Sequence, residues 1–131
     1  MSDQSTPSLG YMAGFDPTLD TTKQLELLEH DDLDTNRGLA ANVNLSIAAQ
    51  DILAESDDEL ILVSLFDNPQ VNTRTKRHII KQNKLKTVLK LYNHYLISSQ
   101  SKVFIYRHTH DIKNRDLSRI KNKYALDNSI N

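Results

Sequence analysis

The sequence predicts an all-α domain built from short helical units that repeat along the chain. Three Gly and three Pro in 131 residues are too few for an all-β fold with many tight turns. Apolar residues recur at helical spacing from about residue 21 onward. The chain also resembles itself when it is shifted by 26 residues, which is typical of repeat architectures. A mass of 15.0 kDa fits one domain.

Three segments are expected along the chain. Residues 1–20 contain two of the three Gly and two of the three Pro and show no helical period, so we expect a flexible leader. Its scattered apolar side chains are expected either to dock onto the domain or to capture a partner. Residues 21–126 are predicted to form a single helical-repeat domain, and residues 127–131 a C-terminal tail.

The 26-residue shift aligns similar residues in successive units. It pairs Gln24 with Gln50, Leu27 with Leu53, Glu29 with Glu55, Leu39 with Leu65, and Asn42 with Asn68. A third, fainter copy continues with Ile79, Leu91 and Ile97. Each unit is therefore predicted to contain a short helix, an acidic turn, a longer apolar helix and an Asn-containing turn.

Residues typical of helix ends lie between these units. Ser56 with Glu59 has the spacing of a capping box ahead of an apolar run. The proline after Asn68 disfavours helical backbone in the asparagine and so ends that helix. Ser46 and Thr73 are the predicted N-caps of the short helices that follow.

The third unit and the C-terminal region also have helical spacing. One apolar stripe is expected to contain Leu85, Val88, Leu89, Tyr92 and Leu96. A last helix is predicted after Asp111, with Leu117, Ile120 and Tyr124 on one face. The C-terminal helices are expected to cap the stack.

Two segments resemble the leucine-rich variant repeat, a relative of HEAT-like helical solenoids. They are LAAN at residues 39–42 and LFDNP at residues 65–69, and the resemblance covers residues 27–80 in two copies. Val43 stands where the second copy has Pro69. The resemblance implies a stacked, right-handed HEAT-like solenoid with C-terminal capping helices and with no fixed activity. A compact helical bundle with accidental repetition is the alternative.

Charge is divided very unevenly along the sequence. Residues 1–73 carry fourteen acidic side chains against Lys23 and Arg37, a net charge of −12. Residues 74–131 carry fourteen Lys and Arg against three aspartates, a net charge of +11. Two interpretations are open. Either the basic half meets an external polyanion, or the opposite charges attract within one molecule or between copies, in a salt-sensitive self-association.

The basic half is the predicted site of nucleic-acid binding, since each neutralised phosphate releases condensed counterions. The candidate phosphate contacts are Arg74, Lys76, Arg77, Lys81, Lys84, Lys86, Lys90, Arg107, Arg115, Arg119 and Lys123. No helix-turn-helix, zinc-finger or aromatic RNA-recognition signature accompanies them, so sequence-independent binding is expected. The pattern does not distinguish DNA from RNA.

The acidic turns support the alternative function, a protein–protein adaptor or inhibitor that also uses the leader. The candidate partner-binding residues are Asp31, Asp32, Asp57, Asp58 and Glu59. Such carboxylates are also common as helix N-caps that complement the helix dipole, and this structural explanation is open as well.

Composition excludes several other classes. The absence of cysteine rules out disulfides, thiolate metal sites and Cys nucleophiles. No nucleophile elbow or phosphate-binding glycine loop is present, so no enzymatic activity and no cofactor are expected. The HTHD sequence at residues 108–111 lacks a second ligand pair, and no metal site is predicted. Without a membrane span or signal peptide, a cytoplasmic protein is expected.

Overall fold

The computed structural model describes residues 7–109, and the regular elements in this range are helices without any strand. This confirms the predicted all-α class. The helices are α1 (Leu9–Phe15), α2 (Thr21–His30), α3 (Leu33–Ala40), α4 (Ile47–Leu53), α5 (Glu59–Asp67), α6 (Thr73–Gln82), α7 (Leu85–Tyr92) and α8 (Ser99–His108). The helix predicted after Asp111 and the tail at 127–131 lie outside the described residues. Within the described range no helix is long and apolar enough to cross a bilayer.

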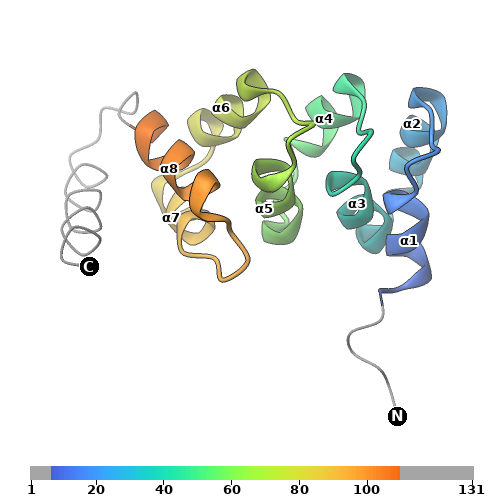
Figure 1. The fold of residues 1–131 in the computed structure, drawn as a ribbon, viewed down its shortest axis with the longest axis horizontal. Helices are drawn as coiled ribbons and strands as arrows, with labels where there is room; N and C mark the ends of the chain where they lie inside the picture. Colours follow the sequence, from blue (N-terminus) through green and yellow to red (C-terminus); the bar gives the residue numbers. More distant parts are fainter. Residues whose placement is uncertain (1–6, 110–131) are drawn as a thin grey trace, which may run out of the picture.

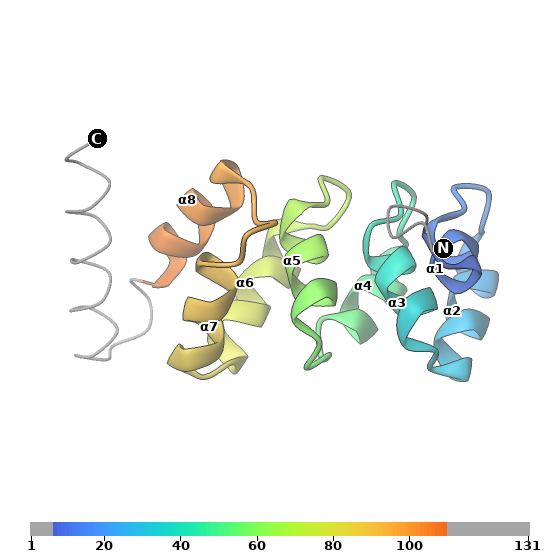
Figure 2. The same cartoon turned by 90° about the horizontal axis from the view of Figure 1, so that it is seen from below.

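Consecutive helices form pairs that follow one another along the long axis of the molecule, from α1 and α2 at one end to α7 and α8 at the other (Figure 1). The first helices of the pairs, α1, α3, α5 and α7, pack in succession. The second helices lie behind them, with α2 packed on α4 and α6 on α8 (Figure 2). The helix α8 also contacts α5 and α7, so it packs against helices of both layers.

The helices begin at equivalent positions 26 residues apart. In the layer of α2, α4, α6 and α8, each helix follows a polar residue whose side chain accepts a hydrogen bond from the N–H three residues on. These N-caps are Asp20, Ser46, Asn72 and Ser98. In the other layer, Asp32 and Asp58 cap α3 and α5, and Lys84 precedes α7 without a side-chain cap. The predicted cap Ser46 is confirmed.

Two predicted helix starts are wrong by one or two residues. The N-cap of α6 is Asn72 and not Thr73. The helix α5 begins after Asp58 and not after Ser56, because the Asp58 carboxylate accepts a hydrogen bond from the N–H of Ile61 at 3.1 Å. The Ser56 hydroxyl instead accepts from the N–H of Asp58 at 3.0 Å, so it shapes the turn before the helix.

Two buried asparagines, 26 residues apart, make equivalent hydrogen bonds to the preceding helical pair. Asn42 Nδ2 donates to the carbonyl oxygens of Gly14 and Asp16, both at 2.9 Å. Asn68 Nδ2 donates to the carbonyl oxygens of Ala40 and Asn42, at 3.0 and 2.9 Å. Since a buried carbonyl without a donor is costly, each asparagine ties one helical pair to the next.

Two glutamines act in the same way on the other side of each pair. Gln24 Nε2 donates to the carbonyl oxygens of Leu19 and Asn44, both at 3.0 Å, and its Oε1 accepts from the N–H of Ser46 at 2.8 Å. Gln50 makes the corresponding bonds to the backbone of Leu45, Gln70 and Asn72. Each glutamine is only 1% exposed. Sequence positions that the 26-residue shift aligned therefore make the same contacts.

The apolar core runs through the whole stack. Its largest fully buried apolar side chains are Leu39, Leu45, Ile61, Leu62, Leu65, Ile79, Ile80, Leu91 and Ile105. Leu39, Leu65 and Leu91 are aligned by the 26-residue shift and occupy the same position in α3, α5 and α7. Each helical pair buries its apolar face against its neighbours, as expected when no single pair can form a core alone.

The helix α7 ends earlier than its apolar stripe suggested. Val88 and Tyr92 are buried as predicted, but the helix stops at Tyr92, where the N–H of Asn93 bonds to the carbonyl oxygen of Leu89. Leu96 consequently lies in the loop before α8 and is 52% exposed. The periodicity continued by chance into a turn.

The helix α1 lies where the sequence predicted a flexible leader. Residues 9–15 form a helix that packs on α3. The backbones approach so closely that a Cβ on Gly14 would lie 2.1 Å from the carbonyl oxygen of Thr35, and one on Gly38 would lie 2.1 Å from that of Tyr11. The described part of the expected leader is thus part of the packed fold, and two glycines make its docking feasible.

Replacing Gly38 with alanine is expected to separate α1 from α3, because the added methyl group meets rigid backbone. We expect the free energy of unfolding, measured by urea titration, to fall by about 3 kcal/mol. The matched control is Gly10→Ala in α1, where the added Cβ lies 2.9 Å from a movable Asp32 carboxylate oxygen. Equal effects of the two substitutions would contradict the close packing of α1 on α3.

Candidate functional site

Eight of the eleven predicted phosphate contacts lie in the described residues. They are Arg74, Lys76, Arg77, Lys81, Lys84, Lys86, Lys90 and Arg107. The other three, Arg115, Arg119 and Lys123, lie outside them. The described candidates all belong to α6, α7 and α8 or to the turn between α6 and α7, at one end of the stack (Figure 1).

Four of these cations lie on the outer surface of the second layer. Arg74, Arg77 and Lys81 follow one another at helical spacing along the exposed side of α6, opposite the buried Ile79 and Ile80. Arg107 of α8 is exposed at the position 26 residues after Lys81. Because α6 packs on α8, the same surface carries cations from both helices.

The other exposed candidates belong to α7. Lys84 directly precedes this helix, Lys86 lies in its first turn and Lys90 one turn later. Since α6 ends at Gln82, the side chains of Lys81, Lys84 and Lys86 are distributed around one short turn. The cations therefore do not form one straight stripe. They extend from the outer surface of α6 and α8 around this turn to α7.

Five of these cations are free of intramolecular ion pairs among residues 7–109. They are Arg77, Lys81, Lys84, Lys86 and Arg107, and all five are exposed. We call these five residues the basic surface. Arg74 and Lys90 do face carboxylates, but at 3.9 Å from Asp51 and 4.0 Å from Glu59, with all four side chains exposed. Such long, solvated pairs contribute little and leave both cations accessible.

Lys76 differs from the other candidates because it is partly buried. It occupies the position of Gln24 and Gln50 in the 26-residue register. Burial lowers the pKa of the Lys76 ammonium, and the Asp67 carboxylate partly opposes this shift. An ammonium has no acceptor oxygen. The N–H of Ser98, which corresponds to the glutamine-bound N–H groups of the earlier pairs, accordingly bonds to Asp67 Oδ1 at 3.2 Å. Lys76 therefore lies apart from the basic surface.

Two of the five acidic candidates are committed to helix capping. Asp32 accepts hydrogen bonds from the N–H and the hydroxyl of Thr35, at 2.9 and 2.8 Å, and these bonds lower the pKa of Asp32. Asp58 caps α5 and also accepts from Arg37 Nε and Nη2, at 3.0 and 2.8 Å. The bonds from Arg37 lower the pKa of Asp58. The capping explanation of the acidic turns is confirmed for these two residues.

The remaining three acidic candidates have separate environments. Asp31 ends α2 in the left-handed conformation, with φ of 51°, and accepts from Asn36 Nδ2 at 3.2 Å. Glu59 faces Lys90, and Asp57 is exposed in the turn before α5 without a hydrogen bond or ion pair to residues 7–109. The fold thus distributes these carboxylates over several turns, and Asp57 is the most accessible of them.

Lys84 replaces the aspartate that caps α3 and α5. Its backbone is extended, with φ of −68° and ψ of 154°, as at the other N-caps, but no side-chain bond is made. We expect Lys84→Asp to stabilise the protein by about 1 kcal/mol in urea unfolding, because aspartate would accept from the N–H of Thr87 and complement the helix dipole. Lys84→Ala is the control, since alanine has no acceptor. Equal stability of the two variants would contradict the capping geometry.

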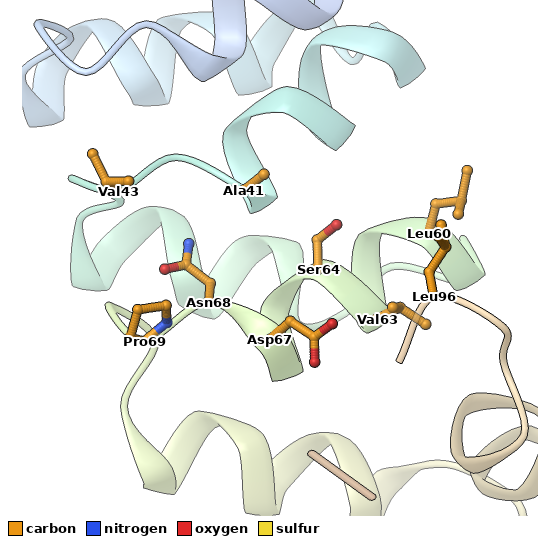
Figure 3. Close-up of a pocket in the computed structure, with 9 residues that line it drawn as sticks. All are labelled: Ala41, Val43, Leu60, Val63, Ser64, Asp67, Asn68, Pro69 and Leu96. Atoms are coloured by element: carbon orange, nitrogen blue, oxygen red, sulfur yellow. The ribbon is translucent and has the colours of Figure 1, made fainter. Parts of the chain in front are cut away.

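An apolar cavity, which the sequence did not indicate, lies on the other layer (Figure 3). Its volume is about 230 Å³, and it is lined by Ala41, Val43, Leu60, Val63, Ser64, Asp67, Asn68, Pro69 and Leu96. The end of α3, the exposed side of α5 and the loop before α8 meet there. None of the predicted site residues lines it. Val43 and Leu96, 57% and 52% exposed, were predicted only as a departure from the repeat and as part of a helical stripe.

Histidines in the described range show no grouping typical of a metal centre. No cluster of three or more potential His, Asp or Glu ligands occurs in residues 7–109. His108 packs its ring on Phe104 with a centroid distance of 4.1 Å, and His78 lies 2.8 Å from a Glu55 carboxylate oxygen. The remainder of the HTHD sequence lies outside the described residues.

Comparisons with known proteins do not identify a relative. No family model matches the sequence, and no curated protein or solved structure matches it.

Proposed function

We propose that this chain is a short solenoid of leucine-rich-variant-like helical pairs that binds nucleic acid without catalysing a reaction. The basic surface is the proposed site, and the phosphate backbone is the proposed ligand. Arg74 and Lys90 lie beside the surface and extend it.

The solenoid assignment is supported by contacts that recur along the chain. N-caps recur at 26-residue spacing over four helices. Asn42 and Asn68 make the same bonds to successive helical pairs, as do Gln24 and Gln50. A bundle with accidental repetition would not require equivalent residues to make equivalent bonds. The proposed unit is therefore one helical pair with its two turns.

The observation that carries the function is the accessibility of uncompensated positive charge. Residues 74–109 contain nine Lys and Arg and no acidic residue. Five of these cations are exposed and form no ion pair with residues 7–109. Like charges on neighbouring helices repel one another, so the fold alone gives no reason to concentrate them. A polyanion removes that repulsion and releases its own counterions.

The arrangement favours backbone contacts over base recognition. Three of the five cations are lysines, which bind phosphate as flexible point charges rather than by a fixed planar geometry. Their distribution over α6, the following turn and α7 follows a curved surface and presents no single helix to a groove. Phosphate contacts position a protein on nucleic acid without specifying sequence. We therefore infer sequence-independent binding.

The test is the salt dependence of binding of the full chain to a random-sequence DNA duplex, measured by fluorescence anisotropy. Each neutralised phosphate contributes a slope of about −0.9 to the plot of log K against log salt. Five contacts predict an affinity loss of about 500-fold between 50 and 200 mM salt. An RNA duplex measured in parallel distinguishes the two nucleic acids. Absence of binding to either at 50 mM salt would overturn the proposal.

The apolar cavity favours a second candidate function, a protein–protein adaptor or inhibitor. Its exposed rim residues Val43 and Leu96 provide an apolar surface of the kind that protein partners cover. In this alternative the accessible carboxylate of Asp57 contributes to partner binding. An adaptor is the expected function if the chain binds neither duplex.

A further inference from the structure

Charge changes sign at equivalent positions along the second layer. Glu29 of α2, Glu55 after α4, Lys81 of α6 and Arg107 of α8 are spaced by 26 residues, and all four are exposed. The helices that carry them lie in one layer (Figures 1 and 2). The outer surface of this layer is therefore acidic at the α2 end and basic at the α6 and α8 end.

The contact between α4 and α6 shows how well the two signs fit. Arg74 of α6 lies 3.9 Å from an Asp51 oxygen of α4, and His78 lies 2.8 Å from a Glu55 oxygen. These pairs compensate the charges in the middle of the surface. They leave the two ends uncompensated within residues 7–109.

The uncompensated ends carry opposite charge. At the α2 end, Glu26 and Glu29 are exposed and make no ion pair with the described residues. At the other end, Arg77, Lys81 and Arg107 are likewise exposed and unpaired in that range. Two opposite charges at the two ends of one surface are complementary to the same surface turned by half a rotation.

We propose that a second copy of this chain binds this outer surface in antiparallel orientation, forming a two-fold symmetric dimer. In this arrangement α2 of each copy lies against α6 and α8 of the other, so the acidic and basic ends pair twice. A parallel arrangement would oppose like charges and is disfavoured. The acidic end has no part in the proposed nucleic-acid site, so the dimer is independent of that function.

The centre of the surface adds a small apolar contact. Ile52 of α4 is 50% exposed, at the register position between Glu26 of α2 and His78 of α6. Near the two-fold axis it would meet its own copy. The surrounding surface is polar and its charges are solvated. The dimer is therefore weak and sensitive to salt, because screening acts strongly on exposed charges.

Charge exchange between variants tests the dimer directly. We expect sedimentation equilibrium to give twice the 15.0 kDa mass for the wild-type chain at low salt, and the monomer mass at high salt. The acidic-end variant Glu26→Lys with Glu29→Lys is expected to be monomeric, as is the basic-end variant Arg77→Glu with Lys81→Glu. An equimolar mixture of the two is expected to form a heterodimer, since each reversed end then meets an opposite charge.

The control and the contrary results are equally specific. Asp57→Lys reverses an exposed carboxylate outside this surface and is expected to leave the dimer unchanged. A wild-type chain that stays monomeric at low salt, assemblies larger than a dimer, or a mixture that fails to associate would each overturn the proposal. The acidic-end variant leaves the basic surface intact. Its nucleic-acid binding therefore reports on the proposed function separately.

Discussion

Replacing Arg77, Lys81 and Lys86 with glutamate is expected to abolish binding of the full chain to a nucleic-acid duplex at moderate salt. These residues come from α6 and α7 and lie on both sides of the turn that bears Lys84. Each lost phosphate contact removes about 0.9 from the salt slope, so three contacts remove about 2.7. Each new carboxylate also repels the backbone. Anisotropy titrations across a salt series measure both effects.

A pair of single substitutions provides the matched control for this prediction. Lys81→Glu on α6 and Lys23→Glu on α2 both reverse one exposed lysine in the same layer. We expect Lys81→Glu to weaken binding by about 10-fold and to lower the salt slope by about one. Lys23→Glu is expected to change neither. Equal losses from both would mean that overall charge, rather than the basic surface, determines binding.

Asn68→Ala is expected to have the largest effect on stability. Its Nδ2 satisfies the buried carbonyl oxygens of Ala40 and Asn42, and its Oδ1 accepts from the N–H of Gln70 at 2.9 Å. Alanine leaves these groups without a partner and removes a side chain that is only 5% exposed. With about 1–3 kcal/mol for each unsatisfied buried group, we expect a loss of about 4 kcal/mol in urea unfolding.

The neighbouring glutamine provides the control for Asn68. The Gln70 side chain is exposed and makes no hydrogen bond to residues 7–109, so Gln70→Ala is expected to change stability by less than about 0.5 kcal/mol. Total stability for a domain of this size is about 5–15 kcal/mol. The Asn68 variant is therefore expected to be close to unfolding at body temperature. A small effect at Asn68 would contradict its role in joining successive helical pairs.

Much of the fold was accessible from the sequence because the chain repeats at a fixed spacing. The shift that aligned Gln24 with Gln50 and Asn42 with Asn68 identified residues that turned out to make equivalent hydrogen bonds. Helix starts were less accurate. Both Ser56 and Asp58 are good capping residues, and only the geometry of the turn selects Asp58.

The docking of α1 was missed for a different reason. In sequence, Gly14 and Gly38 are typical of a flexible segment and a helix interruption. Their function is visible only when α1 and α3 lie together and each glycine meets backbone of the other helix. Local pattern does not report such contacts between distant segments.

The candidate site was predicted in composition but not in arrangement. Charge counting found the basic end, whereas the division of the cations between α6, α7 and α8 required the fold. The burial of Lys76 did have a signal in the sequence, since the 26-residue shift aligns it with Gln24 and Gln50. The apolar cavity had none, because Val43 and Leu96 come from separate turns.

The most direct test of the account is the location of bound duplex on the protein. Backbone amide shifts of the isotope-labelled full chain, recorded during titration with a DNA duplex, report which residues meet the ligand. The account predicts that the affected amides among residues 7–109 cluster at residues 77–90 and around Arg107, with α1 to α4 unchanged. Shifts centred on the acidic turns or on the apolar cavity, with none at the basic surface, would contradict it.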